Sequence, residues 1–278
     1  MIAAATGPRR GRVSPYRVAL WIYAGVFYVL LYAPLVMIVV LSFNDSETIG
    51  FPFRRFTADW YAKVFKTPEF LTALAHSLAV GVLAAVISTA LALFLAMGFR
   101  HEFRFKGALF NLVLAPIVMP GIVGGIMLLM FFGYLGVPPS LWTTVLIAHV
   151  DWVLPFAFLT LYPRLHRFDR AVEEAAMDLG ARPIEVFWHV VLPIVRPAII
   201  ATLLFSFSLS FDEFVRTLFV TGYDRTIPVM FWSMIVEQLT PDLPAMAVII
   251  MLISATTSLI GLVVSRRTRD DAHPATDR

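Results

Sequence analysis

Long apolar stretches without charged residues alternate with short polar segments along almost the whole chain. Residues 18–44 and 71–99 contain no Asp, Glu, Lys or Arg, and each exceeds the roughly 20 residues that a helix needs to cross a bilayer. Residues 107–150 are also free of these charges and are long enough for two spans, separated at residues 133–140 by glycine and prolines. The remaining spans are expected at residues 142–162, 197–219 and 243–265. The pattern predicts an all-α fold with six transmembrane helices.

The polar ends flank a single transmembrane domain of residues 18–265. Residues 1–17 and 266–278 are polar and contain several arginines, and we expect both to be cytoplasmic tails. The first span is too long and too aromatic to be the core of a cleaved signal peptide, so we expect it to be retained. Between the first two spans, Phe56, Trp60 and Tyr61 predict a short helix at the membrane interface.

The polar segment between the fourth and fifth spans has the pattern of two short amphipathic helices. Asp169 is a candidate N-cap, and Gly180 suits the left-handed position that ends a helix. Pro183 suits the first turn of a second helix, which Leu192-Pro193 is expected to end. Each helix has an apolar stripe at helical spacing: Val172, Ala175, Ala176 and Leu179, then Ile184, Phe187, Trp188 and Val191. The segment is predicted to form a compact body on the membrane surface, with an apolar stripe that packs against another surface. An interfacial helical hairpin without a partner is the less favoured alternative.

Composition and charge place the chain in a membrane. Hydrophobic residues make up 59% of the 278 residues, charged residues 15%, and the mean hydropathy is +0.80, whereas a soluble domain is about 25% charged. There is no cysteine, which excludes disulfide and thiol chemistry. The net charge of +3 does not indicate nucleic-acid binding, because the basic residues flank apolar spans. With both termini in the cytoplasm, sixteen of the 22 Lys and Arg residues are cytoplasmic, as the positive-inside rule requires.

Four charged residues fall within the expected spans. A charge at the bilayer centre costs roughly 2.5–3.5 kcal/mol on insertion scales, so it faces a cavity or a partner. Asp151 lies in the fourth span, and Asp212 and Glu213 lie in the fifth, four and three residues before Arg216. Asp212 and Arg216 are expected to pair on one helix face. Either these residues line a pathway for a charged solute or they hold helices together. Asp151 and Glu213, which have no obvious local partner, favour the pathway.

The third span contains two helix-disrupting prolines. Pro116 and Pro120 lie four residues apart and are followed by Gly121 and a Gly-Gly pair. Broken helices are tolerated at membrane depth where protein or a cavity satisfies the backbone. The alternatives are a kink used for packing and a helix that lines a pathway, and we favour the second.

The chain carries no recognisable catalytic or nucleotide-binding motif. It has no Gly-x-x-x-x-Gly-Lys-Ser/Thr loop and no His-Glu-x-x-His run, so we expect neither a cofactor nor a metal. A membrane-embedded enzyme would need a catalytic group within the spans, and His149 with Asp151 is the one candidate. A structural scaffold is a third possibility.

The polar segment resembles the signature loop of the permeases of binding-protein-dependent ABC importers. Glu174-Ala175-Ala176 is followed by Gly180 and, after nine residues, by Val190 and then Leu192-Pro193. The family pattern has Ile in place of Val190. The resemblance implies a type I ABC importer permease (MetI-like) core, with residues of about 164–196 forming coupling helices in a groove of an ATPase dimer. It also implies a second permease subunit, an external solute-binding protein, the bacterial inner membrane, and a transport function rather than an enzymatic one.

Further segments resemble the spermidine/putrescine branch of this family. They are residues 42–46, 148–150, 210–214, 227–228 and 232–234. The resemblance implies a polyamine or a related small organic nitrogen compound as solute, whereas other branch members carry opines, iron or other small organic solutes. Two departures weaken the polycation interpretation: Gly121 stands where polyamine members often have an acid, and Arg216 adds positive charge beside the acid pair.

Overall fold

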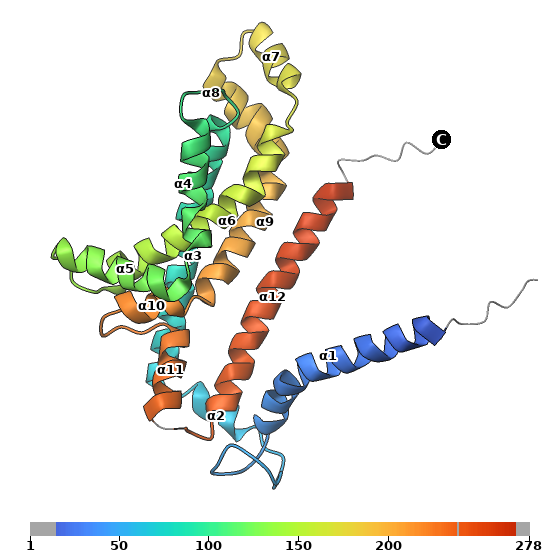
Figure 1. Ribbon diagram of the computed structural model, residues 1–278, viewed down its shortest axis with the longest axis vertical. Helices are drawn as coiled ribbons and strands as arrows, with labels where there is room; N and C mark the ends of the chain where they lie inside the picture. Colours follow the sequence, from blue (N-terminus) through green and yellow to red (C-terminus); the bar gives the residue numbers. More distant parts are fainter. Residues whose placement is uncertain (1–14, 238, 271–278) are drawn as a thin grey trace, which may run out of the picture.

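The computed structural model describes residues 15–237 and 239–270, which form an elongated, almost entirely helical protein (Figure 1). Five helices in these residues are long and apolar enough to cross a membrane, and a bent pair of helices supplies a sixth crossing if it counts as one span. The elements are α1 (Pro15–Leu41), α2 (Asp59–Val64), α3 (Pro68–Gly98), α4 (Lys106–Val118), α5 (Gly121–Tyr134), η1 (Leu141–Val145), α6 (Leu146–His166), α7 (Arg170–Asp178), α8 (Pro183–Val186), η2 (Phe187–Val191), α9 (Leu192–Phe211), α10 (Val215–Val220), α11 (Ile227–Glu237) and α12 (Leu243–Asp270).

The predicted all-α architecture is confirmed, and four of the six predicted spans have a simple counterpart. The first is α1, the second α3, the fourth η1 with α6, and the sixth α12, with ends displaced by a few residues. The expected interfacial helix is the short α2, which begins after the aromatic Phe56 and contains Trp60 and Tyr61. Helices η1 and η2 are π-helical turns that lead into α6 and α9.

Helix α3 lies at the centre of the bundle and packs most extensively on α6 and α9. Many of its buried side chains are small, as in Ala84, Ser88 and Ala92, so that neighbouring backbones approach closely. Large apolar side chains such as Val86 and Phe94 instead point outward and are exposed. Small residues inside and large apolar residues outside are typical of a helix in lipid, where packing holds helices together.

The third predicted span is bent rather than straight. Helices α4 and α5 meet at an angle of 107°, and Figure 1 shows α5 running across the bundle beside α10. Met119 is extended, with ψ 127°, because a residue that precedes a proline is disfavoured in the helical region. Pro120 then removes a backbone donor. The second predicted break is confirmed: α5 ends at Tyr134, and Gly136 follows with φ +68°.

The fifth span begins and ends earlier than the predicted residues 197–219, since the continuous helical segment is Pro183–Phe211. Pro193 does not end a helix, because helical structure continues from Pro183 to Phe211. The π-turn of η2 directly precedes Leu192-Pro193, and its wider turn makes room for a proline ring that would clash in a regular α-helix. At the other end α9 stops at Phe211, and the chain breaks before the separate helix α10.

Helices α5 and α10 are held together at a glycine. A Cβ atom on Gly125 would lie 2.5 Å from Cδ2 of Phe219, so any side chain there forces the two helices apart. We expect Gly125→Ala to lower the stability of the purified protein by about 1–3 kcal/mol, as overpacking does. Thermal unfolding in detergent measures this. Gly133→Ala is the control on the same helix, since no atom lies within 4 Å of its added Cβ, and an unchanged melting temperature for Gly125→Ala would contradict the packing.

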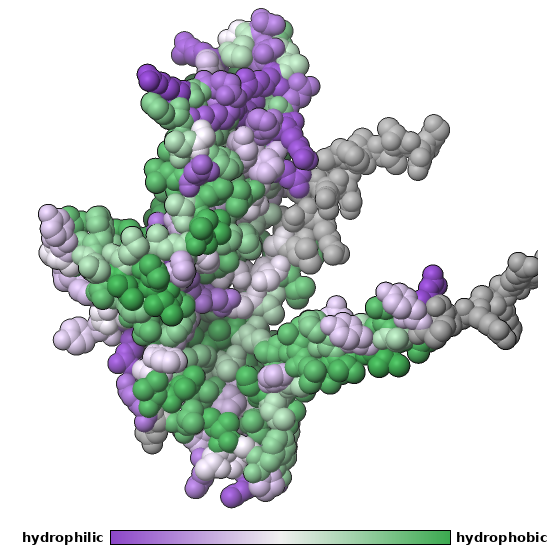
Figure 2. Space-filling view, in the orientation of Figure 1, coloured by the Kyte–Doolittle hydropathy of each residue, from purple (hydrophilic) through white to green (hydrophobic). Residues whose placement is uncertain are grey.

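Polar residues collect at the ends of the long bundle. In Figure 2 the hydrophilic surface covers the end formed by α7 and α8, while apolar surface dominates the length of the helices. Helix α1 extends away from the bundle, and none of its membrane-spanning window is buried within this chain. This apolar helix therefore needs lipid or another protein around it.

Candidate functional site

The turn between α7 and α8 has the geometry that the sequence predicts. The Asp169 side chain accepts a hydrogen bond from Ala171 N at 3.0 Å and caps α7. Gly180 has φ +92°, and the Gly180 and Ala181 amides donate to the carbonyls of Met177 and Ala176, which is a Schellman motif. Pro183 opens α8 as expected. The two helices form a hairpin at the polar end of the bundle (Figure 1); below we call residues 169–191 the α7–α8 hairpin.

One apolar face of this hairpin is exposed. Leu179 is 91% exposed, Ile184 61% and Trp188 56%. The predicted stripe of the second helix is divided, because Val191 is buried together with Val186 against the ends of α3 and α6. Buried residues fix the hairpin to the bundle, and the remaining apolar side chains form an exposed patch at its surface.

The signature residues of the loop have different environments. Glu174 and Ala175 are exposed on α7, whereas Ala176 packs against the core cluster beneath the hairpin. Gly180 forms the turn, and Leu192 and Pro193 lie at the start of α9. Within the described part of the chain, these residues lie on the exposed surface of the hairpin, in its turn and in the packed layer beneath it, and they do not converge on a pocket.

A buried ion pair joins α7 to the end of α3. Nη2 of Arg100 contacts Oε1 of Glu173, and Arg100 is almost fully buried. The Arg170 side chain donates to the Arg100 carbonyl, and the ring of Phe168 lies 5.4 Å from the guanidinium carbon of Arg100. Sequence reasoning missed this pair because its members are 73 positions apart and each is also typical of a solvated loop.

A second charged group lies where the interrupted helices meet. Arg216 pairs with Glu213, with 3.5 Å between Nη1 and Oε2, and both are buried. The predicted pair of Asp212 with Arg216 is wrong, because α9 ends at Phe211 and α10 begins at Val215, so the two residues do not lie on one continuous helix. Glu213, for which the sequence suggested no partner, is the residue that pairs. Arg216 also stacks on Trp152 of α6, 4.0 Å from the ring centre.

Asp151 and Asp212 are the two acids of the predicted pathway that form no ion pair among the described residues. Both are exposed in this chain although they lie among apolar helices, and Asp212 accepts a hydrogen bond of 2.8 Å from Ser254 of α12. A carboxylate facing lipid at this depth is costly, so each requires an aqueous cavity or a second protein.

His149 does not form a catalytic pair with Asp151. Its Nδ1 lies 2.6 Å from the Ser210 hydroxyl and its Nε2 lies 2.7 Å from the Thr217 hydroxyl, and the ring is buried. Both ring nitrogens are thereby used to join α6 to α9 and α10. The enzyme hypothesis loses its one candidate group.

The two prolines of the third span bring the bend close to this charged group. Pro116 lies in α4, and Pro120 begins the turn into α5. A Cβ atom on Gly121 or Gly124 would lie 3.9 Å or 3.7 Å from nitrogen atoms of Arg216. The bend of the third span and the break of the fifth therefore meet at one guanidinium group.

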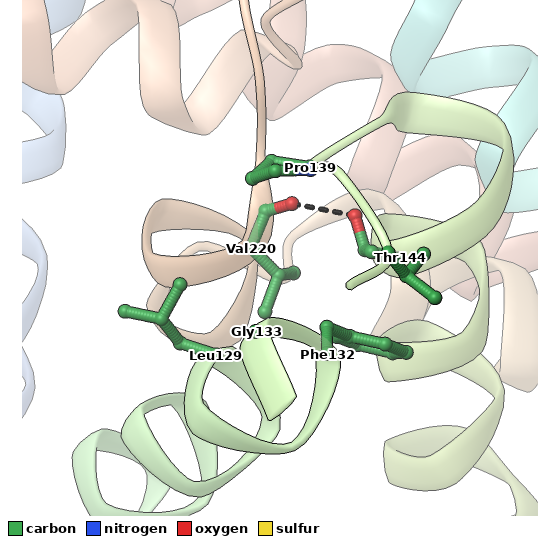
Figure 3. A pocket seen from close by; sticks show the side chains of 7 residues that line it. Leu129, Phe132, Gly133, Pro139, Thr144 and Val220 are labelled. Carbon is green, nitrogen blue, oxygen red and sulfur yellow. Dashed lines mark hydrogen bonds between the residues drawn. The ribbon is translucent and has the colours of Figure 1, made fainter. Parts of the chain in front are cut away.

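A small pocket beside α5, η1 and α10 has a structural role. Figure 3 shows Leu129, Phe132 and Val220 around it, with the Thr144 hydroxyl donating to the Val220 carbonyl at 2.7 Å. Its lining is apolar and its one hydroxyl is already bonded, so it offers no group to a charged solute.

Comparison with known proteins identifies a family and several similar permeases. A model of the family described as binding-protein-dependent transport system inner membrane component matches residues 88–270. The chain is similar to the spermidine/putrescine transport system permease protein PotC of Escherichia coli (strain K12), at 33% identity over 241 residues, covering 86% of this chain and 90% of the relative. PotC of Haemophilus influenzae is 31% identical over 244 residues, covering 87% and 94%. The putrescine transport system permease protein PotI of Escherichia coli (strain K12) is 32% identical over 246 residues, covering 86% of each.

Solved structures give the same fold at low sequence identity. A chain of a bacterial ABC transporter involved in the import of the acidic polysaccharide alginate superimposes with a TM-score of 0.69 at 14% identity, covering 91% of this chain and 96% of that one. The alginate transporter in complex with a pentasaccharide-bound periplasmic protein gives a TM-score of 0.68, covering 91% and 94%. These two matches show the likeness of fold alone.

Proposed function

Since the chain belongs to the family of binding-protein-dependent transport system inner membrane components, we propose that it imports a polyamine or a related small organic nitrogen compound as one subunit of a larger transporter. Family membership makes the chain an integral membrane permease of an ABC importer rather than an enzyme. The solute, the partner subunits and the residues that carry each role belong to the proposal.

The exposed apolar face of the α7–α8 hairpin is the observation that carries the coupling role. Exposed apolar side chains at the polar end of a membrane protein are suited to a protein partner. We assign the hairpin to the groove of a separate ATP-binding subunit dimer, which supplies the energy. The five arginines in the segment of residues 164–196 belong to the side of the membrane that holds sixteen of the 22 Lys and Arg residues, which favours a cytoplasmic position for this hairpin and for both termini.

Two further partners complete the transporter. An external solute-binding protein delivers the solute, in keeping with the family name and with the periplasmic protein bound by the alginate transporter. A second, related permease faces this one. The exposed Asp151 and Asp212 support a second permease, because an aqueous passage between two such chains would keep both carboxylates out of lipid.

The relatives are named as spermidine/putrescine and putrescine permeases, which favours an amine as solute. The direct experiment measures uptake of labelled putrescine and spermidine by cells that carry or lack this chain. Uptake that depends on the chain is expected. Uptake of an opine or of iron, with no uptake of either amine, would show that the chain transports a different solute. The assignment as a permease would stand.

Removing the negative charge of Asp151 or Asp212 is expected to slow amine uptake. Asp151→Asn and Asp212→Asn should each lower the initial rate per folded transporter by about tenfold, because each removes attraction for a cation in a poorly screened passage. Binding of the ATPase subunit should be unchanged. Asp59→Asn, at an exposed acid of α2 outside the long spans, is the control. Normal uptake by both variants would remove these acids from the pathway.

A further inference from the structure

Arg216 is a buried arginine whose guanidinium group lies on an aromatic ring. Its Cζ atom is 4.0 Å from the centre of the Trp152 ring, and the residue is 3% exposed. Oε1 of Glu213 accepts a hydrogen bond from the Arg216 backbone at 2.8 Å, and Oε2 lies 3.5 Å from Nη1. An aromatic face together with a carboxylate is the arrangement that binds an organic ammonium group. Here a side chain of the protein supplies the cation.

This arrangement lies where the start of α5 approaches the guanidinium closely. A Cβ atom on Gly121 or Gly124 would lie within 4 Å of a nitrogen atom of Arg216, and neither glycine places a side chain between α5 and the guanidinium. The break between α9 and α10 passes the same point. Interrupted helices at membrane depth are tolerated where they surround a cavity or a site.

The charged residues around Arg216 include more carboxylates than cations. Arg216 balances Glu213, but Asp151 and Asp212 remain open nearby without an ion-pair partner among the described residues. Asp151 directly precedes Trp152 on α6 and is exposed. An arginine that leaves the Trp152 ring therefore has a second carboxylate within its electrostatic reach.

We infer that the Trp152 ring and the Glu213 carboxylate form a subsite for a protonated amine of the solute, and that Arg216 occupies this subsite until a solute amine replaces it. This inference rests on the proposed function. It explains why a permease for an amine carries an arginine beside its acids: the arginine keeps the subsite closed when no solute is present.

Equilibrium binding tests the subsite directly. The probe is labelled putrescine or spermidine, added to the purified permease–ATPase complex without the binding protein. We expect Arg216→Gln to tighten binding by about tenfold, because the tethered cation no longer competes. Adding Trp152→Leu or Glu213→Gln to that variant should reverse the gain, whereas Trp152→Phe should keep part of it. Arg55→Gln removes an exposed ion-paired arginine outside the group and should leave binding unchanged.

A purely structural ion pair predicts a different result. Arg216→Gln would then lower the abundance of the complex, and Arg216→Gln with Glu213→Gln would restore it, with the same amine affinity in both. Equal affinity in wild type and Arg216→Gln overturns the subsite, even where cells take up the amine normally. Failure of wild-type cells to take up either amine overturns the proposed substrate and the subsite together.

Discussion

Replacing Gly180 with valine is expected to abolish uptake while the protein still inserts into the membrane. Gly180 has φ +92°, a conformation that costs a β-branched residue most. No atom lies within 4 Å of an added Cβ, so the cost is backbone strain and not a clash. Relieving that strain breaks the Schellman turn and misdirects α8 relative to α7. Uptake per inserted molecule and co-purification of the ATPase subunit measure the loss.

Two variants separate this strain from a general defect. Gly180→Asn should retain part of the uptake, because asparagine tolerates positive φ better than other residues that carry a side chain. Gly107→Val should retain nearly all of it, since Gly107 has ordinary φ and open space around it near the same end of the bundle. Normal uptake by Gly180→Val would remove the α7–α8 hairpin from coupling.

Glu173→Ala is expected to uncouple the transporter almost as severely. It leaves Arg100 as a buried charge without its carboxylate, which costs about 3–5 kcal/mol. The cheapest relief is for the end of α7 to lift off α3, because the rest of the bundle does not depend on this contact. We expect amine uptake to fall at least about tenfold per folded transporter. ATP hydrolysis should lose its stimulation by the loaded binding protein.

The same pair can be removed without leaving a buried charge. Arg100→Met with Glu173→Met should recover much of the uptake, because apolar residues of similar size replace buried ion pairs at little cost. Glu102→Ala is the matched control: its pair with Lys106 lies in the adjoining loop, and its side chain is 89% exposed, so little change is expected. A double variant no better than Glu173→Ala would show that the charges, and not the attachment of α7, are needed.

The sequence by itself determined the features that depend on local patterns. The apolar lengths predicted the spans, and Asp169, Gly180 and Pro183 predicted the cap, turn and start of the α7–α8 hairpin. These succeed because a cap, a positive φ and a proline at the first turn each concern neighbouring residues. The same local reasoning failed at Pro193, because the π-turn of η2 accommodates the proline ring and the helix continues through it.

Only the tertiary structure decided which charged residues meet. Periodicity along one continuous helix assigned Arg216 to Asp212, but the helix ends at Phe211, and Arg216 turns to Glu213 and to Trp152 on another helix. The Arg100–Glu173 pair and the two bonds of His149 likewise join segments more than sixty positions apart. In an apolar bundle a buried charge or ring nitrogen takes whichever partner the packing brings near, and the order of residues along the chain does not contain that information.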